Sequence, residues 1–269
     1  MFQKLRKSKK LLLIAMACAT FAIAGCGSDT TKNTADNGNA ITWSETFDGT
    51  KTDFAVKSAP THAVSMSQAT TEMMLQLGLE DKMAGTAFKE EEIYPPLQAA
   101  YDKVKVLSDK WPSYEVFMSV KPDFATGWPD SFSKRAIPAD KMISQKVNIW
   151  IPESMLSTKA DLETNFSDMI KLGEIFGVKP KAEEWVADQR KTLAAIQNKL
   201  KDLPRKRVFI YDSEDGQPFT AFEGYTTNIL KLIGADNVMS GLGVDKTWAK
   251  GSWETVIAQN PDYIIIADY

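Results

Sequence analysis

The chain has 269 residues, and 43% of them are hydrophobic, which is enough to bury one large core or two modest ones. The formal net charge is −3, from 32 basic and 35 acidic side chains, so we expect no nucleic-acid partner. With a single histidine, His62, the chain cannot build a zinc or manganese site on several histidines.

The first 25 residues have the pattern of a secretory signal peptide. Five basic residues between positions 4 and 10 precede an apolar run at 11–23. That run is too short to span a bilayer, because a spanning helix takes about 20 residues. It ends in Gly25-Cys26, which resembles the lipobox of bacterial lipoproteins. We therefore expect cleavage before Cys26 and lipidation of its thiol; the alternative is an ordinary signal peptide followed by a chance cysteine.

The residues after the expected cleavage point form a tether. Cleavage would remove five basic residues and no acidic one, leaving 27 basic and 35 acidic side chains and no second cysteine for a disulfide. Residues 26–40 are rich in Ser, Thr, Asn, Asp and Gly and have no apolar periodicity, so we predict a flexible segment. A lipid and a tether would hold the protein on the outer side of the cell membrane without spanning it.

Residues 41–157 are predicted to form an α/β lobe. A hairpin at 41–54 turns at Asp48-Gly49. Beyond it, apolar strand patterns alternate with amphipathic helix patterns, which is typical of a largely parallel sheet. The strands are expected at 63–66, 82–86, 104–107, 123–127 and 147–151, and helices at 71–79, at 131–145 and immediately after Ser113.

A helix–turn–strand pattern occurs twice in the chain. Residues 113–128 and 252–267 match at an offset of 139, with a serine, a glutamate and a Pro-Asp pair in the same places. A second repeat, at an offset of 156, pairs residues 70–85 with 226–241 and predicts a helix, a glycine stop and a short strand in each copy. The two repeats indicate two lobes of similar build.

Residues 158–204 are predicted to be a connecting helical region. Helices are expected at 161–176 and 182–203, with an interruption at 177–180 and a stop at Pro204. The second helix would be roughly 33 Å long at 1.5 Å per residue, a suitable length for a strut between two lobes. Its apolar residues form two heptad rows, namely Val186, Leu193 and Leu200 in one row and Ile196 and Leu203 in the other.

Residues 205–269 are predicted to form a second α/β lobe. Strands are expected at 207–211 and 218–221, followed by a helix that ends near Ile233 and the second copy of the helix–turn–strand pattern. The chain stops directly after a strand. We therefore expect the second lobe to be C-terminally incomplete and the chain to be a fragment.

The sequence contains none of the common catalytic motifs. There is no G-x-S-x-G elbow, P-loop, G-x-G-x-x-G or H-E-x-x-H, and His62 has no histidine partner. We therefore expect no enzymatic activity, although many carboxylate pairs leave an enzyme possible in principle.

The chain has, in this order, a lipoprotein signal, a hairpin, an α/β lobe, a long connecting helix and a second α/β lobe. In this order of elements it resembles the helical-backbone solute-binding proteins of ABC importers, which serve ferric siderophores, cobalamin and haem. The resemblance covers residues 41–269 and implies capture of a ligand between two lobes and delivery to a permease and its ATPase, without covalent chemistry or a cofactor. Local matches lie at 60–65, at Thr71-Glu72 with Leu77-Gly78, at 115–124 and at 252–266.

The resemblance also implies roles for individual residues. Glu115 and Glu254 match the positions that dock onto permease arginines, although an acidic residue early in a helix is favoured by the helix dipole in any case. Ligand contacts are expected in the loops that follow the strands. The candidates are Ser67, Gln68, Trp111, Trp128, Arg135, Tyr225 and Trp248.

Each candidate has a structural alternative. The tryptophans could pack locally, and Trp150 is expected in the core because it lies within a strand. Arg135 would suit an anionic iron chelate or be a solvated helix residue, and Tyr225 could hydrogen-bond a ligand or bind haem iron. The preferred function is therefore capture of a ferric siderophore or a similar iron complex. The alternatives are a cobalamin or haem binder, a surface-anchored hydrolase, and a ligand-sensing lipoprotein.

Overall fold

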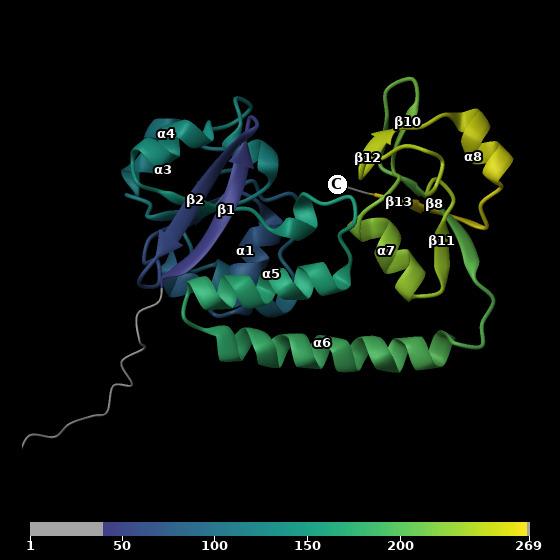
Figure 1. The fold of residues 1–269 in the computed structure, drawn as a ribbon, viewed down its shortest axis with the longest axis horizontal. Helices are drawn as coiled ribbons and strands as arrows, with labels where there is room; N and C mark the ends of the chain where they lie inside the picture. Colours follow the sequence, from purple (N-terminus) through teal and green to yellow (C-terminus); the bar gives the residue numbers. More distant parts are fainter. Residues whose placement is uncertain (1–39, 268–269) are drawn as a thin grey trace, which may run out of the picture. The chain divides into compact units, whose positions relative to one another are not determined.

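A computed structural model describes residues 40–267 of the chain (Figure 1). The signal peptide, Cys26 and the tether up to residue 39 lie outside the described residues, so the predictions made for them stay predictions. The described part has the predicted α/β architecture, with parallel sheets in two lobes and a long helix between them.

The first lobe begins with the predicted hairpin. Strands β1 (Ile41–Phe47) and β2 (Thr50–Val56) pair antiparallel, and Asp48 and Gly49 between them both have positive φ, as a two-residue hairpin turn requires. The hairpin is fixed to the rest of the lobe by two long-range hydrogen bonds. The Trp43 indole donates to the Ile149 carbonyl at 2.7 Å, and the Glu45 carboxyl accepts from the Ile151 N–H at 3.0 Å.

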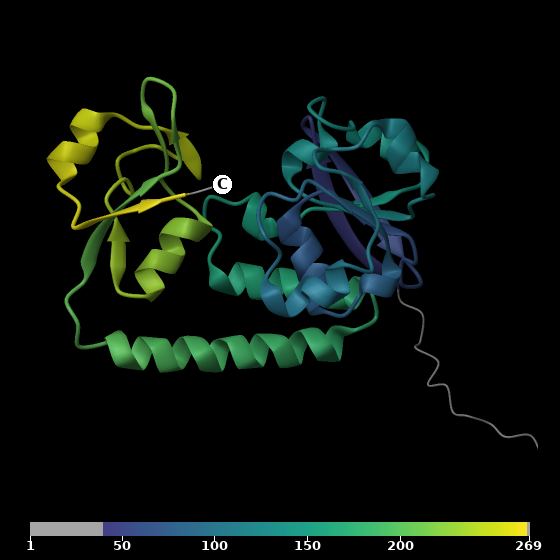
Figure 2. The ribbon, with the colours of Figure 1, turned by 180° about the vertical axis from the view of Figure 1, so that it is seen from behind.

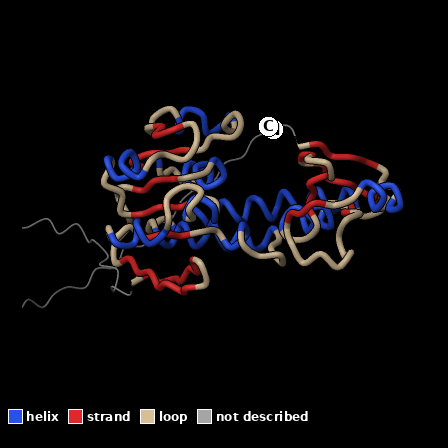
Figure 3. The backbone as a smooth tube through the Cα atoms, turned by 90° about the horizontal axis from the view of Figure 1, so that it is seen from above, coloured by secondary structure: helices blue, strands red, loops and turns tan. Residues whose placement is uncertain are grey.

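The sheet of the first lobe is entirely parallel, in the order β5-β4-β3-β6-β7. Figure 3 shows its strands side by side. They are β3 (Ala63–Ser65), β4 (Met83–Ala87), β5 (Val106–Ser108), β6 (Phe124–Thr126) and β7 (Asn148–Trp150).

The two faces of this sheet are covered by different helices. Ala63 and Phe124 pack in one apolar cluster, which includes side chains of α1 (Gln68–Gln76). Their strand neighbours Val64 and Ala125 pack in the other, because successive strand residues face opposite sides. That second cluster includes side chains from α3 (Tyr114–Ser119) and α4 (Ala139–Ser144), whereas α2 (Gln98–Tyr101) contributes Tyr101 to the first. Trp150 is buried, as expected.

The predicted helix at 131–145 is wrong in extent. The segment forms a 3₁₀ turn, Pro129–Phe132, and then the short helix α4, with Pro138 as its N-cap. Proline has no N–H and its ring disfavours helical geometry in the residue before it, so a continuous helix cannot pass through Ile137-Pro138.

Two helices connect the lobes. Helix α5 (Leu162–Ile175) starts at a capping box, in which the Asp161 carboxylate accepts from the Thr164 N–H at 2.9 Å. Helix α6 (Lys179–Leu200) starts three residues earlier than predicted, because Pro180 occupies its first turn, where proline is tolerated. The chain reverses at Gly177, whose φ is 70°.

Only the first part of α6 packs closely. Ala182 and Val186 are buried in the core of the first lobe, whereas Ile196 and Leu203 of the second predicted apolar row are exposed. Near the far end, the Gln197 amide donates to the Leu232 carbonyl at 3.4 Å. Figures 1 and 2 show α6 running alongside α5 and continuing past it to the second lobe.

The second lobe contains two small sheets. One is parallel, in the order β11-β8-β13, and the other is antiparallel, in the order β12-β10-β9. Helices α7 (Tyr225–Leu232) and α8 (Trp253–Gln259) complete the lobe. The strands are β8 (Lys206–Tyr211), β9 (Ser213–Glu214), β10 (Pro218–Ala221), β11 (Ala235–Asn237), β12 (Trp248–Lys250) and β13 (Tyr263–Ile266).

Two details of the second lobe differ from prediction. The strand expected at 239–241 is a turn, and the strand that follows the helix is β11, immediately after Gly234, where it pairs with one edge of β8. Strand β12 was expected to be part of a loop; it forms because its backbone pairs with β10. All four residues of β13 are exposed, so the core of this lobe rests mainly on buried residues of β8 such as Phe209.

The two lobes repeat one polar interaction. Asp123 precedes β6, and its carboxylate accepts from the backbone N–H groups of Thr61 and His62 at 2.8 and 3.0 Å. Asp262 precedes β13, and its carboxylate accepts from the Arg207 N–H at 2.8 Å. Each aspartate therefore holds the start of the central strand of its sheet, which agrees with the repeat read from the sequence.

A second repeated contact ties a helix to a strand. Thr71 of α1 hydrogen-bonds Thr86 of β4 at 2.6 Å, and Thr227 of α7 accepts from the Asn237 amide of β11 at 2.7 Å. Thr71 and Thr227 are fully buried, so in each lobe the first helix is fixed to the strand that follows it.

Glu45 provides a test of the packing beneath the hairpin. Burial raises the pKa of this carboxyl from its ordinary 4.5 to about 7, against the lowering effect of the Ile151 N–H and with help from the charges of Glu153 and Asp168. The folded state therefore binds this proton more tightly than the unfolded state. Its contribution to stability is fully present below pH 4.5 and is lost as pH rises toward 7.

We expect Glu45→Gln, which keeps an acceptor for Ile151 and carries no charge, to remove this pH dependence. The free energy of unfolding of the variant relative to wild type should rise by about 2 kcal/mol between pH 5 and pH 8. Urea titrations at both pH values would measure it. Glu184→Gln, at an exposed position of α6, is the control; the same pH response in both variants would contradict the interpretation.

Candidate functional site

Two cavities lie between the lobes and share Trp248. The larger has a volume of about 790 Å³ and is lined from the first lobe by Phe88 and Lys110 and from the second by Phe219. The smaller, of about 520 Å³, is lined among others by Trp128 and Tyr225. Most of the first-lobe lining follows the carboxyl ends of β4, β5 and β6, which is where ligands bind in open parallel sheets.

A stacked aromatic pair stands on each side of the larger cavity. In the first lobe, the rings of Phe88 and Trp111 lie 4.6 Å apart at an interplanar angle of 24°. In the second, Phe219 and Trp248 lie 6.1 Å apart at 20°. Phe88, Phe219 and Trp248 all border the cavity, so both lobes offer aromatic surface to the same volume.

The position of Phe88 is held from several sides. Its φ is 59°, an unusual value for a bulky side chain. Its ring stacks on Trp111, whose indole N–H donates to the Met66 carbonyl at 3.1 Å, and the Lys110 ammonium lies 5.2 Å from the ring centroid. Trp111 thus supports Phe88 from behind and is not itself among the lining residues.

The charges along the cavities are mixed. The larger cavity is lined by two lysines and three carboxylates, and the smaller by one carboxylate, Glu223. Glu223 is held in place because it accepts from the Ser240 hydroxyl and from the Gly241 N–H at 2.8 Å. The lining has no excess of cations, so it does not favour a highly anionic ligand.

Two candidate residues from the sequence have structural contacts instead of a place in the lining. Ser67 is fully buried as the N-cap of α1 and accepts from the Thr70 N–H at 3.3 Å. Gln68 accepts from the N–H groups of Glu90 and Glu91 at 2.9 and 2.7 Å and donates to the Glu92 carbonyl at 3.2 Å. Gln68 therefore positions the loop that carries Glu90 and Glu91 to the larger cavity.

Three candidates do line the cavities. Trp128 and Tyr225 border the smaller one, and Trp248 borders both. The Trp128 indole donates to the Glu90 carboxylate at 3.4 Å, which links the two cavities on the first-lobe side. Burial raises the pKa of the Tyr225 phenol, so it remains a hydrogen-bond donor at neutral pH.

Arg135 is not brought to this site. Its guanidinium forms an ion pair with Asp130 and its side chain is 71% exposed. It borders neither cavity between the lobes. The cations that do line the larger cavity are Lys89 and Lys110, the second of which is next to Trp111 in the sequence.

Phe219 is a lining residue that sequence analysis did not identify. It was placed inside a predicted strand, and strand residues were taken as core. The alternation of strand side chains between two faces could have indicated it. Pro218 and Thr220 are buried on one face of β10, so Phe219 between them lies on the other face.

Glu115 and Glu254 lie in the first turns of α3 and α8, one in each lobe. Both helices begin with a serine N-cap, since Ser113 accepts from the Val116 N–H at 3.3 Å and Ser252 from the Thr255 N–H at 3.1 Å. Both glutamates are exposed. A backbone hydrogen bond and the Ser113 hydroxyl lower the pKa of Glu115, so it is charged at neutral pH.

Residues 40–267 contain neither a cluster of metal-binding side chains nor a membrane-spanning helix. No group of three or more histidine, cysteine or acidic side chains is arranged to hold a metal ion. Across the same residues, no helix combines the length and the hydropathy needed to cross a bilayer.

Comparison with known families decides what kind of protein has this cleft. The model of the family described as periplasmic binding protein matches residues 64–269. The chain belongs to the periplasmic binding protein family. The resemblance to helical-backbone solute-binding proteins, first seen in the order of elements and the paired repeats, is thereby confirmed.

Individual members of the family support the assignment. A crystal structure of a periplasmic binding protein from Veillonella parvula is 98% identical, with a TM-score of 0.85 over 86% of this chain and 78% of that one. An ABC transporter substrate-binding lipoprotein of Bacillus subtilis is 26% identical over 97% of this chain and 82% of its own. A vitamin B12-binding protein of Vibrio vulnificus is 24% identical over 80% of this chain and 74% of its own.

A more distant structure shows the same fold. The crystal structure of an ABC-type Fe³⁺-hydroxamate transport system from Saccharomonospora viridis is 19% identical, with a TM-score of 0.66 over 83% of this chain and 79% of that one. This periplasmic binding protein therefore shares its fold with a protein that is named for a different ligand from the vitamin B12 of the Vibrio vulnificus relative.

The role of Gln68 can be tested without a ligand. We expect Gln68→Ala to loosen residues 90–92, because it removes two acceptor contacts and one donor contact to their backbone. Hydrogen exchange of the Glu90 and Glu91 amides, followed by NMR or mass spectrometry, should become about tenfold faster or more. Gln98→Ala, which removes only a surface contact to Asp102, is the control; unchanged exchange in the Gln68 variant would refute the positioning role.

Proposed function

We propose that this protein is the lipid-anchored solute-binding protein of an ABC importer and captures a metal chelate between its two lobes. Family membership supports the transport class, and the names of the relatives are those of binding proteins rather than enzymes. The observation that carries the ligand class is the pair of aromatic stacks on opposite sides of one cavity.

The aromatic lining suits a ligand with broad apolar or conjugated faces. Aromatic rings contribute large contact areas at little cost in side-chain entropy, and Trp128 and Tyr225 add polar groups at the margin. A cavity of about 790 Å³ beside one of about 520 Å³ is of the size that accommodates ligands of drug size or larger.

The mixed charges narrow the choice of chelate. A ferric ion bound by three hydroxamates carries no net charge, whereas a ferric tris-catecholate is strongly anionic and would place its charge against four carboxylates. We therefore propose a ferric hydroxamate-type siderophore as the ligand. The Saccharomonospora viridis protein, which is named for Fe³⁺-hydroxamate transport, is consistent with this choice.

Cobalamin is the second candidate. The curated relative from Vibrio vulnificus is named for vitamin B12, and a corrinoid would also present a broad face to the aromatic pairs. Haem ranks lower, because its two carboxylates would have to compete with Glu90, Glu91 and Asp212 for the two lysines of the same lining. Tyr225 remains the candidate that could bind haem iron.

A ligand panel tests the proposal. Isothermal titration of the purified protein with a ferric trihydroxamate, a ferric tris-catecholate, cyanocobalamin and haemin should give micromolar or tighter binding, about −8 kcal/mol or better, for the trihydroxamate. Trp248→Ala should weaken that binding about tenfold or more, because it removes a stacking surface from both cavities.

Tyr263→Ala removes an exposed aromatic ring of the same lobe away from the cleft and should leave the affinity unchanged. Preference for cyanocobalamin over the trihydroxamate would establish the second candidate. No binding of any chelate, together with turnover of an ester or peptide, would replace the proposal with a surface-anchored hydrolase; binding without any importer-dependent uptake would favour a ligand-sensing lipoprotein.

We also propose that Glu115 and Glu254 dock onto arginines of the permease, and that lipidation at Cys26 keeps the protein at the membrane. The two glutamates are exposed, lie on opposite lobes and occupy equivalent helix positions, so a two-lobed permease surface could engage both at once.

The double variant Glu115→Ala/Glu254→Ala should lose about tenfold or more of chelate uptake in proteoliposomes that contain the permease and ATPase. Its affinity for the chelate should not change. Glu184→Ala/Asp202→Ala removes the same charge from exposed positions of and beside α6 and should retain uptake. Equal uptake by both double variants would argue against docking through the two glutamates.

A further inference from the structure

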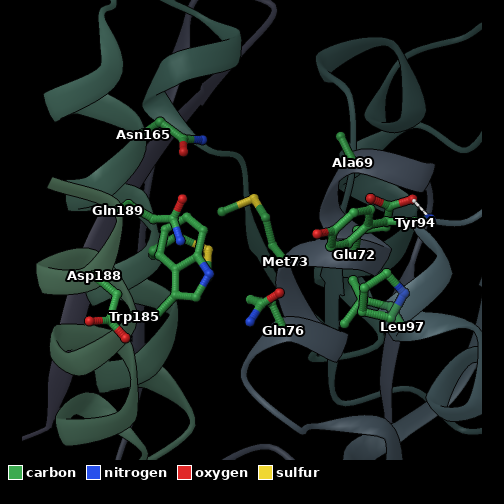
Figure 4. A pocket seen from close by; sticks show the side chains of 12 residues that line it. Ala69, Glu72, Met73, Gln76, Tyr94, Leu97, Asn165, Trp185, Asp188 and Gln189 are labelled. Carbon is green, nitrogen blue, oxygen red and sulfur yellow. Dashed lines mark hydrogen bonds between the residues drawn. The ribbon is translucent and has the colours of Figure 1, made fainter. Parts of the chain in front are cut away.

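A third cavity, of about 660 Å³, lies outside the cleft, where α1 faces the connecting helices (Figure 4). One wall is formed by α1 and by the segment that carries Tyr94 and Leu97. The other is formed by α5 and by the first half of α6, from which Trp185, Asp188 and Gln189 reach the cavity. Figure 4 shows Met73 of α1 extending between the two walls.

The apolar surface of this cavity is centred on Trp185. The indole is half-buried, and its ring meets Phe166 edge to face at a centroid distance of 6.1 Å, so it is held from the core side. Met73, Met169 and Leu97 add further apolar surface. A partly exposed aromatic ring beside methionine and leucine side chains suits a ligand with methylene or methyl groups.

The only charged groups in the lining are two carboxylates, Glu72 and Asp188, and no lysine or arginine is present there. One oxygen of Glu72 accepts from the Gln68 amide at 2.9 Å and from the Tyr94 N–H at 3.2 Å, so the carboxylate is held in position. Within residues 40–267, no hydrogen bond or ion pair engages the other Glu72 oxygen or the Asp188 carboxylate.

Three carboxamides also face the cavity. The side chains of Gln76, Asn165 and Gln189 line it and have no hydrogen-bond partner among the described residues. They are free to accept hydrogen bonds from a ligand. A bare metal ion is a poor fit, since no three acidic, histidine or cysteine side chains of the described chain come together.

We propose that this cavity binds a linear alkyl polyamine. Its ammonium groups would pair with Glu72 and Asp188 and donate to the carboxamides, and its methylene chain would lie on Trp185, Met73 and Leu97. A cation over the face of a tryptophan is itself stabilised by the ring, so the aromatic and acidic parts of the lining select the same ligand.

The site adjoins the cleft between the lobes but is distinguished from it by lining residues of its own. Ala69, Met73 and Asn165 border both this cavity and the smaller cavity of the cleft, but Trp128, Tyr225 and Trp248 border only the cleft, and Trp185 and Asp188 only this one. Variants on either side can therefore assign a bound ligand to one site.

Titration of the purified protein with spermidine at low ionic strength tests the proposal. We expect saturable binding with a dissociation constant of about 1 mM or below. Glu72→Gln/Asp188→Asn should weaken it about tenfold or more, since both substitutions keep the shape and the acceptor oxygen while removing the charge. Thermal melting of the double variant would verify that it is folded.

Matched controls make the result decisive. Glu184→Gln removes a carboxylate from the same helix outside the cavity, and Trp248→Ala alters the cleft; neither should change spermidine affinity. Absence of binding, or unchanged affinity in the double variant, would overturn the proposal. So would binding of a neutral sugar that depends on Trp185 with no spermidine binding, because the site would then select hydroxyl groups instead of cations.

Discussion

The architecture of both lobes depends on an aspartate that holds the backbone at the start of the central strand. Asp123 and Asp262 each follow a proline at the end of a short helix, and each accepts hydrogen bonds from backbone N–H groups near the start of β3 or β8. The same aspartates donate their own N–H groups to carbonyls of these segments, at 3.1 Å to His62 and 2.8 Å to Arg207. These reciprocal bonds fix the register of β6 on β3 and of β13 on β8. Because the register is fixed at the amino ends, the loops at the carboxyl ends lie at defined positions around the cleft.

Much of this fold could be predicted from the sequence because its signals are local. The Asp-Gly hairpin turn, the serine N-caps and the strand runs act within a few residues, and the spacing of Glu115 and Glu254 from their Pro-Asp pairs carries the repeat. Two errors, the helix at 131–145 and the start of α6, come from the local effects of Pro138 and Pro180, and the others arise where a distant segment decides. Strand β12 exists because β10 pairs with it, and the strand after the helix lies at 235–237 instead of 239–241, where it pairs with β8 and Asn237 donates to the buried Thr227.

The candidate site was predicted less completely for the same reason. A loop position indicates proximity to the cleft, but not whether a side chain turns inward. The Ser67 hydroxyl caps α1, the Gln68 amide binds the backbone of Glu90, and Arg135 forms an ion pair with Asp130. Phe88 reaches the cavity through a positive φ that no sequence pattern indicates. Of the candidate tryptophans, Trp128 and Trp248 border the cavities, whereas Trp111 stacks behind Phe88.

Met73 borders both the cavity beside Trp185 and the smaller cavity of the cleft, together with Ala69 and Asn165. Methionine is unbranched and has three rotatable bonds, so its thioether can swing toward either compartment at small cost. A movement of this side chain toward one cavity takes space from that cavity and leaves it to the other. Any occupant that shifts Met73 must then alter the affinity of the neighbouring compartment, and thermodynamic reciprocity requires that it experience the same factor in return.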